Sequence, residues 1–236
     1  MFETTASRTE NRLTTFPAFF KVEGKHVAVF GNGDEAYAKA RLLSNTNALI
    51  VAFSDDPQSD YAAFLDKEQI NVVAEAFAVH QVEGMTLVFA ATGDEALDRQ
   101  IVDAARAKSI PANAVDQPGY CDFYTPGLVS RAPLAVAICT EGAGPVLGQI
   151  VRARIDQMLA PSLGSLARLA VEYRDAAEAS IPKGALRRNF WRRFFSGSVA
   201  DAVALNDVDA AHAAAEKLLL SPESPEGYVW LVGAGP

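Results

Sequence analysis

The chain has 236 residues, half of them apolar, and a formal net charge of −8 at pH 7. This length allows one large or two modest domains with a sizeable core, and the moderate glycine and proline content argues against general disorder. The acidic balance excludes general nucleic-acid binding, although a local basic pocket stays possible. No apolar run approaches the roughly 20 residues needed to cross a bilayer. Two cysteines and a polar, mixed-charge N-terminus fit a cytoplasmic protein without a secretory signal.

Strand-like and helix-like segments alternate between residues 27 and 115. Strands are expected at 27–30, 48–53, within 70–77, at 85–92 and at 110–115, and helices at 34–45, 61–67 and 94–109. The segment at 85–92 is apolar almost throughout, which is typical of a buried parallel strand. This alternation predicts an α/β fold, in which helices cover both faces of a Rossmann-like parallel sheet.

The character of the chain changes after Asp116. Residues 128–142 offer two strand-like pieces around Arg131-Ala132-Pro133, and a helix is expected at 144–160. Residues 161–220 favour helices, with breaks near 181–184 and 196–198. We therefore expect these parts: a flexible tail at 1–15, an NAD-binding Rossmann domain at 16–116, a small β arm at 117–145, a helical domain at 146–220, and a linker with the start of a further domain at 221–236.

The last ten residues, GYVWLVGAGP, resemble a strand that runs into a glycine turn. A glycine-rich loop after a strand normally leads into a helix. We therefore expect this polypeptide to be the front part of a longer one. The alternative is a tail strand that adds to an existing sheet.

A dinucleotide fold requires G-x-G-x-x-G between its first strand and first helix. Here the motif begins at Gly31, continues through Asn32, Gly33, Asp34 and Glu35, and has Ala36 at the third glycine position. Alanine is accepted there because the position needs only close packing of helix and strand. The second glycine lets the backbone approach a pyrophosphate, whose charge the helix N-terminus favours. An ordinary strand–helix turn would also contain glycine, so the choice between a dinucleotide-binding loop and a simple turn depends on the neighbouring segments.

Two further loops support a cofactor edge. Asp55 and Asp56 follow the second strand about 20 residues on, where a carboxylate would bind the adenosine ribose and repel the extra phosphate of NADP. The alternative is that Ser54-Asp55-Asp56-Pro57 is only a turn. Thr92, before Gly93-Asp94, follows the long apolar strand and is a second candidate cofactor contact.

With these pieces placed, the chain resembles the N-terminal module of siroheme synthase, the family of precorrin-2 dehydrogenase and sirohydrochlorin ferrochelatase. Six stretches carry the resemblance in order: FPAFFKVEGKHVAVFGNGDEAYAKARLL (16–43), FAATGD (89–94), NAVDQP (113–118), RAPLAVAICTEGAGPVLGQIVRARID (131–156), RRNFWRRFF (187–195) and VWLVGAGP (229–236). Each motif is weak by itself, but the ordered set is specific. The last stretch looks like the start of the fused uroporphyrinogen-III methyltransferase domain.

The resemblance implies two reactions. NAD-dependent dehydrogenation converts precorrin-2 to sirohydrochlorin, and insertion of ferrous iron then gives siroheme. The Asn-x-x-Asp turn of the family places its catalytic aspartate at Asp116, where one carboxylate could serve both steps as general base. The alternative is that Asp116 only shapes the turn before Pro118. Family members are homodimers whose arms pair, which would also protect the strand edges of this arm.

The tetrapyrrole substrate is polyanionic, so an acidic protein must gather positive charge locally. Arginine binds carboxylates bidentately. The candidate substrate contacts are Arg131, Thr140, Gly142, Arg152 and Arg154. A second basic cluster comprises Arg187, Arg188, Arg192 and Arg193, for which a solvated helix face is the alternative.

One departure from the family concerns Cys139-Thr140-Glu141-Gly142, where members often have Ser-Ser-Gly-Gly. Thr140 keeps a hydroxyl, but Glu141 adds a charge that would repel a polyanion, bind iron or point away. Cys139 as a metal ligand is less common than Cys139 as a small buried residue. No His–Cys cluster has the spacing of a metal site, so ferrous iron is expected as a substrate, not as a resident metal. Two alternatives stay open: a dehydrogenase without chelatase activity and a nucleotide-sensing module that binds NAD without turnover.

Overall fold

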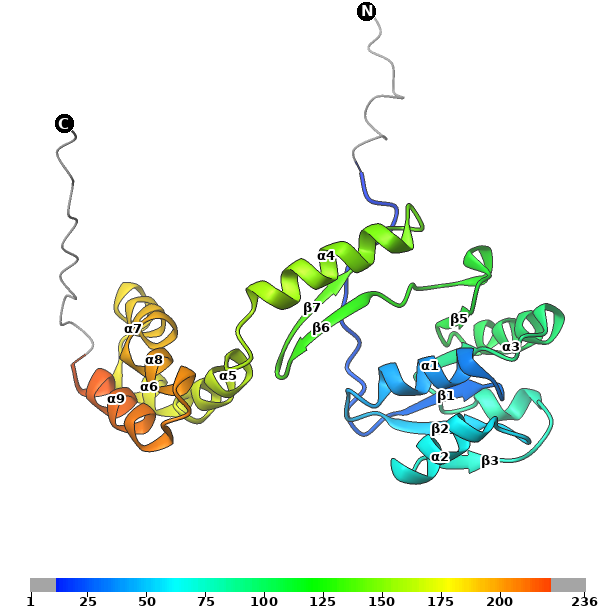
Figure 1. Cartoon of the computed structure of the whole chain (residues 1–236), viewed down its shortest axis with the longest axis horizontal. Coiled ribbons are helices and arrows are strands. Elements are labelled where there is room, and N and C mark those ends of the chain that lie inside the picture. The colour runs from blue at the N-terminus through cyan, green and yellow to red at the C-terminus, as the bar shows by residue number, and fades with distance from the viewer. Residues whose placement is uncertain (1–11, 222–236) are drawn as a thin grey trace, which may run out of the picture. The chain divides into compact units, whose positions relative to one another are not determined.

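The computed structural model describes residues 12–221, which divide between two compact units, Met1–Thr125 and Pro126–Pro236. Figure 1 shows the sheet and its helices in the first unit, and a strand pair followed by helices in the second. The proposed start of a methyltransferase domain and most of the expected N-terminal tail lie outside the described residues.

The first unit is built on a five-stranded sheet in which all neighbouring strands are parallel. Its strands are β1 (His26–Phe30), β2 (Leu49–Phe53), β3 (Asn71–Val73), β4 (Leu87–Ala90) and β5 (Ala112–Ala114). The order is β3-β2-β1-β4-β5, so the chain reverses its direction of travel between β1 and β4. This order is that of a nucleotide-binding half of a doubly wound fold, with its crevice at the reversal point.

Helices cover both faces of this sheet, because alternate side chains of each strand point to opposite faces. Val27 and Val29 of β1 pack under helices α1 (Asp34–Leu43) and α2 (Ser59–Lys67). Ala28 and Phe30 face the other side. That side is covered by α3 (Glu95–Ala107) and the short 3-10 helix η2 (Val79–Val82). Burying each valine or isoleucine side chain fully contributes ~1.5–3 kcal/mol, so the two layers hold the sheet firmly.

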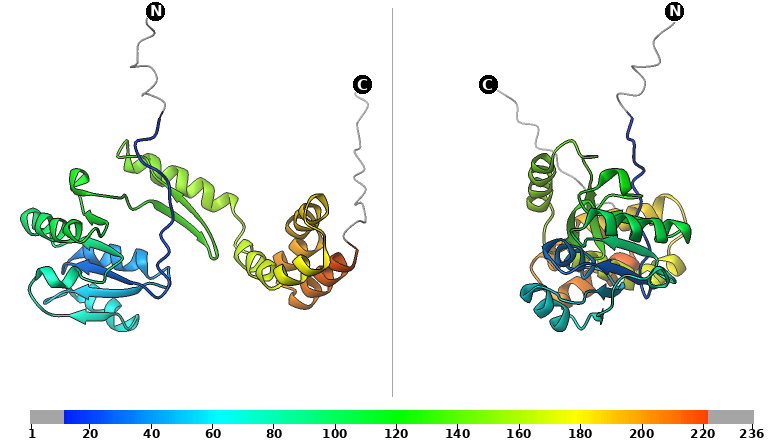
Figure 2. Two further views of the ribbon diagram at one scale, coloured as in Figure 1. Left: turned by 180° about the vertical axis from the view of Figure 1, so that it is seen from behind. Right: turned by 90° about the vertical axis from the view of Figure 1, so that its right-hand side faces the viewer.

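The second unit begins with an antiparallel pair, β6 (Gly127–Arg131) and β7 (Leu134–Ile138). Helix α4 (Pro145–Met158) lies along the pair, as Figure 2 shows. None of the residues of α4 is buried, and Val146, Leu147 and Ile150 are among its exposed apolar side chains. The second unit thus leaves apolar side chains of α4 uncovered.

Five helices complete the second unit. They are α5 (Leu163–Glu172), α6 (Arg174–Ser180), α7 (Ala185–Ser196), α8 (Ser198–Ala204) and α9 (Val208–Leu220). Phe190 and Phe194 of α7 are fully buried at the centre of their common core. The expected breaks near 181–184 and 196–198 are present, and two further breaks occur at Tyr173 and at 205–207.

The predicted fold class is confirmed: a Rossmann-like parallel sheet, a small β pair and a helical region follow one another along the chain. The apolar run expected as a strand at 85–92 is a strand only at Leu87–Ala90. Ala91 and Thr92 belong to the following loop, where Ala91 donates its N–H to the carbonyl of Phe30. Among residues 12–221, no helix is both long enough and apolar enough to span a membrane.

Candidate functional site

The candidate site lies at the carboxyl edge of the parallel sheet. Parallel strands all end at one edge, so the loops that follow β1, β2, β4 and β5 meet there. These loops begin at Gly31, Ser54, Ala91 and Val115 respectively. The sequence-predicted cofactor residues and Asp116 therefore belong to one edge, although they are up to 85 positions apart along the chain, from 31 to 116.

Gly31 forms the sharp turn at the reversal point. Its φ is +137°, a conformation that side chains rarely adopt, and an added Cβ would lie 2.0 Å from the carbonyl oxygen of Ala91. The loop after β4 thus passes directly over the glycine. Ala36, at the third glycine position, is fully buried, as close helix–strand packing requires. These contacts explain the first and third positions of the motif without any ligand.

Gly33, the second glycine of the motif, is not required by backbone conformation or close packing. Gly33 has an ordinary φ of −105°, and an added Cβ would meet only the end of the Gln58 side chain at 3.4 Å. Gly33 is also the N-cap of α1, and no side chain caps this helix. Its first-turn N–H groups are therefore available to an anion, the arrangement that binds pyrophosphate in dinucleotide folds. Asp34 is exposed and Glu35 partly buried in that first turn.

The second candidate loop has a helix N-terminus that the protein itself satisfies. Asp94 caps α3, and its carboxylate accepts from the N–H groups of Ala96 and Leu97. Thr92 donates its hydroxyl to the buried carboxylate of Asp98, which also accepts from the N–H of Thr92. Burial raises the pKa of Asp98. The N-terminus of α1, not that of α3, is thus the better phosphate site.

The loop after β2 is tied to the glycine loop by side chains. Asn32 donates from Nδ2 to Asp55 Oδ1 at 2.7 Å and accepts from the Ser54 hydroxyl at 2.6 Å. The bond from Asn32 lowers the pKa of Asp55. Asp55 therefore presents a carboxylate beside the glycine loop, on the β2 side where an adenosine ribose would lie. Asp56 is exposed next to it.

Asp116 lies on the other side of the reversal point, two residues after the end of β5. Its side chain is exposed and its φ is +57°, in the left-handed region. Residues held in sparsely populated backbone regions persist where surrounding contacts fix them, often at functional sites. The contacts around this loop therefore show what holds Asp116 in this conformation.

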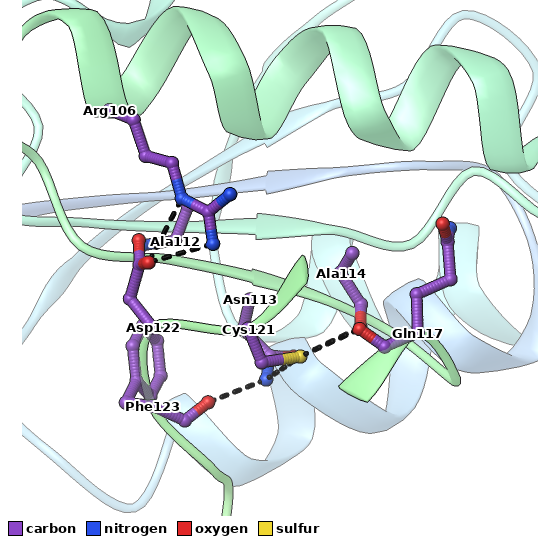
Figure 3. A network of polar contacts seen from close by, with 8 residues as sticks. All are labelled: Arg106, Ala112, Asn113, Ala114, Gln117, Cys121, Asp122 and Phe123. Carbon is purple, nitrogen blue, oxygen red and sulfur yellow. Dashed lines mark hydrogen bonds and ion pairs between the residues drawn. The ribbon is translucent and has the colours of Figure 1, made fainter. Parts of the chain in front are cut away.

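A polar network closes the loop that carries Asp116 (Figure 3). Asp122 accepts from the Ala112 N–H at 3.0 Å and from Arg106 Nε at 2.9 Å. Asn113, buried in β5, donates from Nδ2 to the Phe123 carbonyl at 2.8 Å, and the Cys121 thiol donates to the Ala114 carbonyl. Burial raises the pKa of that thiol, which disfavours its reactive thiolate form. Both ends of the loop are thereby fixed to the sheet.

Lys39 of α1 reaches the same loop. Its Nζ donates to the hydroxyl of Thr125 at 3.0 Å, and its charge interacts with Asp116, Cys121 and Glu35. Burial lowers the pKa of Lys39 below its ordinary value. No local sequence signal marks Lys39 as a site residue, although it lies within the stretch 16–43 that carries the family resemblance.

The predicted substrate contacts lie in the second unit. Arg131 is largely committed within that unit: Nη1 contacts Asp156 Oδ1 at 3.0 Å, and Nε and Nη2 donate to the Leu159 carbonyl. Arg152 donates from Nε to the Leu128 carbonyl, and Arg154 is exposed on the same helix. Arg131 thus joins β6 to the end of α4, a structural role that the sequence did not reveal; substrate binding by these arginines stays a prediction.

The segment 139–142 forms the turn before α4. Thr140 accepts the Ala143 N–H at its carbonyl, while Glu141 and Gly142 have φ values of +50° and +84°. No group of three or more metal-binding side chains occurs among the residues that the structure describes. Contact of Thr140 and Gly142 with the substrate stays a prediction, whereas Cys139, for which a small buried position was the commoner expectation, is exposed.

The basic cluster of α7 divides in two. Arg187 donates to the carbonyls of Ile181 and Glu178, and Arg193 to the carbonyl of Ser221, so both hold helix ends. Arg188 and Arg192 are exposed, one turn apart. Half of the cluster thus has a structural role, which the pattern of charges alone did not distinguish.

The sheet order, the uncapped glycine loop and the acid after β2 define a dinucleotide-binding protein of the Rossmann class. Comparison with known proteins agrees. The family model "Putative NAD(P)-binding" matches residues 18–127, and the model "Sirohaem synthase dimerisation region" matches residues 162–219. The chain is thus similar, over both units, to the matching part of siroheme synthases.

Two relatives illustrate the similarity. The siroheme synthase of Thioalkalivibrio sulfidiphilus is 36% identical over 224 residues, which cover 94% of this chain and 46% of that protein. Siroheme synthase 1 of Cronobacter sakazakii is 37% identical over 220 residues, which cover 93% and 47%. The chain thus spans about half the length of the relatives it matches. The solved structure of SirC, precorrin-2 dehydrogenase, has a TM-score of 0.72 at 18% identity and covers 86% of this chain and 100% of that one, a likeness of fold.

Proposed function

We propose that this chain catalyses the NAD-dependent dehydrogenation of precorrin-2 to sirohydrochlorin. A hydride passes from the macrocycle to the nicotinamide, and Asp116 accepts the proton that leaves with it. The two hydrogens removed from the substrate are thereby accounted for as NADH and a protonated carboxyl group. The relatives named siroheme synthase and the likeness to a precorrin-2 dehydrogenase support this reaction.

One observation carries the proposal: Asp116 and the uncapped glycine loop belong to the same edge of one sheet. Asp55 follows β2 on one side of the reversal point, and Asp116 follows β5 on the other. A dinucleotide that binds across this point would have its adenosine at the first residue and its nicotinamide towards the second. The carboxylate of Asp55 favours NAD, because it would repel the 2′-phosphate of NADP. Gly31, Asn32, Gly33, Asp34, Glu35, Asp56 and Thr92 complete the proposed cofactor site.

Iron insertion is the second proposed step. Asp116 would accept pyrrole N–H protons as ferrous iron enters sirohydrochlorin, and the iron is a substrate. The proposed contacts to the carboxylates of the tetrapyrrole are Arg131, Thr140, Gly142, Arg152 and Arg154. The alternative is a dehydrogenase without chelatase activity; Glu141 adds negative charge that would oppose binding of either tetrapyrrole, so assaying the two steps separately distinguishes the alternatives.

We propose that the protein works as a homodimer in the cytoplasm. The matched dimerisation region and the uncovered apolar side chains of α4 support a second copy as partner. The two free cysteines of the chain fit the reducing conditions of the cytoplasm. Replacing Ile150 with Glu should weaken the dimer, as measured by light scattering after size-exclusion chromatography; an unchanged dimer would place the interface elsewhere.

The test is to supply precorrin-2 and NAD and to measure NADH and sirohydrochlorin, then to add ferrous iron and measure siroheme. Asp116→Ala should abolish both reactions and leave NAD binding intact. Asp66→Ala is the matched control, because Asp66 is an exposed aspartate at the far end of α2. A module that only senses NAD would bind the cofactor equally in all three proteins and produce no NADH. That outcome would end the enzyme proposal.

A further inference from the structure

Gln58 lies beside the glycine loop, because its backbone is bonded to that loop on one side and to α2 on the other. Its N–H donates to the carbonyl of Asn32 at 2.9 Å, and its own carbonyl accepts the N–H of Ala62 at 2.8 Å. The side chain of Asn32 bonds to Ser54 and Asp55, at the start of the same loop after β2. The position of Gln58 is therefore set by contacts within the first unit itself.

The side chain of Gln58 lies over Gly33. A Cβ added at Gly33 would be 3.4 Å from Gln58 Nε2 and 3.9 Å from its Cδ, so the amide is next to the place where a pyrophosphate would approach the backbone. Gln58 is the N-cap of α2, yet its side chain caps no N–H group of that helix. The side chain is exposed and, within residues 12–221, forms no hydrogen bond. Its amide N–H groups are thus available to a ligand.

The charges around Gly33 give a reason for a neutral donor at this place. Asp34 and Glu35 lie in the first turn of α1, and Asp55 and Asp56 follow β2. These carboxylates oppose the approach of an anionic pyrophosphate. The free N–H groups at the N-terminus of α1 offset part of that repulsion. A glutamine amide adds N–H donors without adding a further negative charge.

We infer that Gln58 is a cofactor-binding residue that donates an amide N–H to the pyrophosphate of the dinucleotide over Gly33. The inference rests on the function proposed above. Gln58 follows β2 and therefore belongs to the adenosine side of the reversal point, away from the hydride that is transferred. A bond at this place is the same in the ground state and in the transition state, so it strengthens binding and leaves the rate of hydride transfer unchanged.

Calorimetric titration with NAD compares Gln58→Ala, which removes the donor, with Gln58→Glu, which replaces it by a carboxylate of similar shape. The Kd for NAD should rise about 5- to 30-fold in Gln58→Ala, as expected for one lost hydrogen bond to a charged group. It should rise further in Gln58→Glu, and added salt should narrow the gap between the two variants, because salt screens exposed charges. Gln100→Ala and Gln100→Glu, at an exposed position on α3, are the matched controls and should bind NAD as the unmodified protein does.

Two further measurements show which part of the cofactor meets the amide. The phosphorus NMR signals of bound NAD should differ between Gln58→Ala and the unmodified protein, and should be the same in Gln100→Ala. In turnover, Gln58→Ala should raise the KM for NAD and keep kcat within about two-fold, the pattern of lost uniform binding. A Kd of Gln58→Ala within about two-fold of the unmodified protein would overturn the inference. Weaker binding with unchanged phosphorus signals would also overturn it, because the amide would then meet another part of the cofactor.

These outcomes separate the inference from the function on which it rests. If the unmodified protein does not bind NAD, both fail. If it binds NAD but forms no NADH from precorrin-2, while Gln58→Ala weakens binding, the proposed function fails and the role of Gln58 stands. If it forms NADH and Gln58→Ala binds NAD equally well, the function stands and the role of Gln58 fails. Hydrogen exchange of the β1 and β4 amides should be the same in Gln58→Ala and the unmodified protein, which excludes unfolding as the cause of weaker binding.

Discussion

Replacement by alanine should lower the stability of the first unit at Gly31 but weaken NAD binding at Gly33. In Gly31→Ala the added Cβ would lie 2.0 Å from the Ala91 carbonyl oxygen, at a φ of +137°. The backbone conformation alone costs about 1–3 kcal/mol for a residue with a side chain. The overlap must be relieved by moving backbone, which adds to this cost. We expect the first unit to lose about 3 kcal/mol or more of its free energy of unfolding.

In Gly33→Ala the φ of −105° suits alanine, and the new Cβ would meet only the flexible end of Gln58 at 3.4 Å. The gain from a stiffer unfolded chain and the loss of a favourable N-cap glycine nearly cancel, so stability should change by less than about 1 kcal/mol. The Cβ would stand where a pyrophosphate approaches the backbone. NAD binding should therefore weaken about 10-fold or more, equivalent to about 1.4 kcal/mol.

The assay must report on the first unit alone. Trp191 lies in the second unit, so its fluorescence does not follow the unfolding of the first unit. Hydrogen exchange of the β1 and β4 amides in increasing urea gives the stability, and calorimetric titration gives the Kd for NAD. Unchanged NAD binding by Gly33→Ala would refute the role of this loop in holding the cofactor. A Gly31→Ala protein as stable as the parent would refute the argument from close approach.

Four other outcomes can be measured. Asp55→Asn should improve binding of NADP relative to NAD about 10-fold or more, since it removes the repulsion between the carboxylate and the 2′-phosphate, as comparison of the two Kd values will show; equal ratios would contradict it. The hydrogen bond from Asn32 stabilises the folded state fully above pH 3.8, the ordinary pKa of an aspartate, and this stability should be lost as pH falls through the lowered pKa of Asp55. NMR titration of the Asp55 carboxyl group should show that pKa lowered in the unmodified protein and closer to its ordinary value in Asn32→Ala. Asp122→Ala should cost about 1–3 kcal/mol, because the Ala112 N–H loses its acceptor, and slow NADH formation; normal exchange of β5 amides would argue against this. Phe190→Ala should cost the second unit about 3–5 kcal/mol, visible in Trp191 fluorescence, with NAD binding unchanged.

The sequence by itself determined the elements and their class. Apolar runs of strand length, the acidic first turn and basic last turn of α3, and glycine at 31 and 33 are local signals, because they depend on backbone conformation and on residues a few positions apart. The ordered motifs likewise predicted the family. Helix breaks at Tyr173 and at 205–207 were missed, since no glycine or proline marks them.

Tertiary structure alone decided which side chains meet. It showed that Arg131 and Arg187 bond to carbonyls of their own unit, although their charge had suggested ligands. It also brought Lys39 to Thr125, 86 positions away, and Asn32 to Asp55. These pairings follow from the register of parallel strands and the crossing of helices over them, which place distant loops at one edge. The burial that lowers the pKa of Lys39 depends on that assembly, and no local pattern in the sequence encodes it.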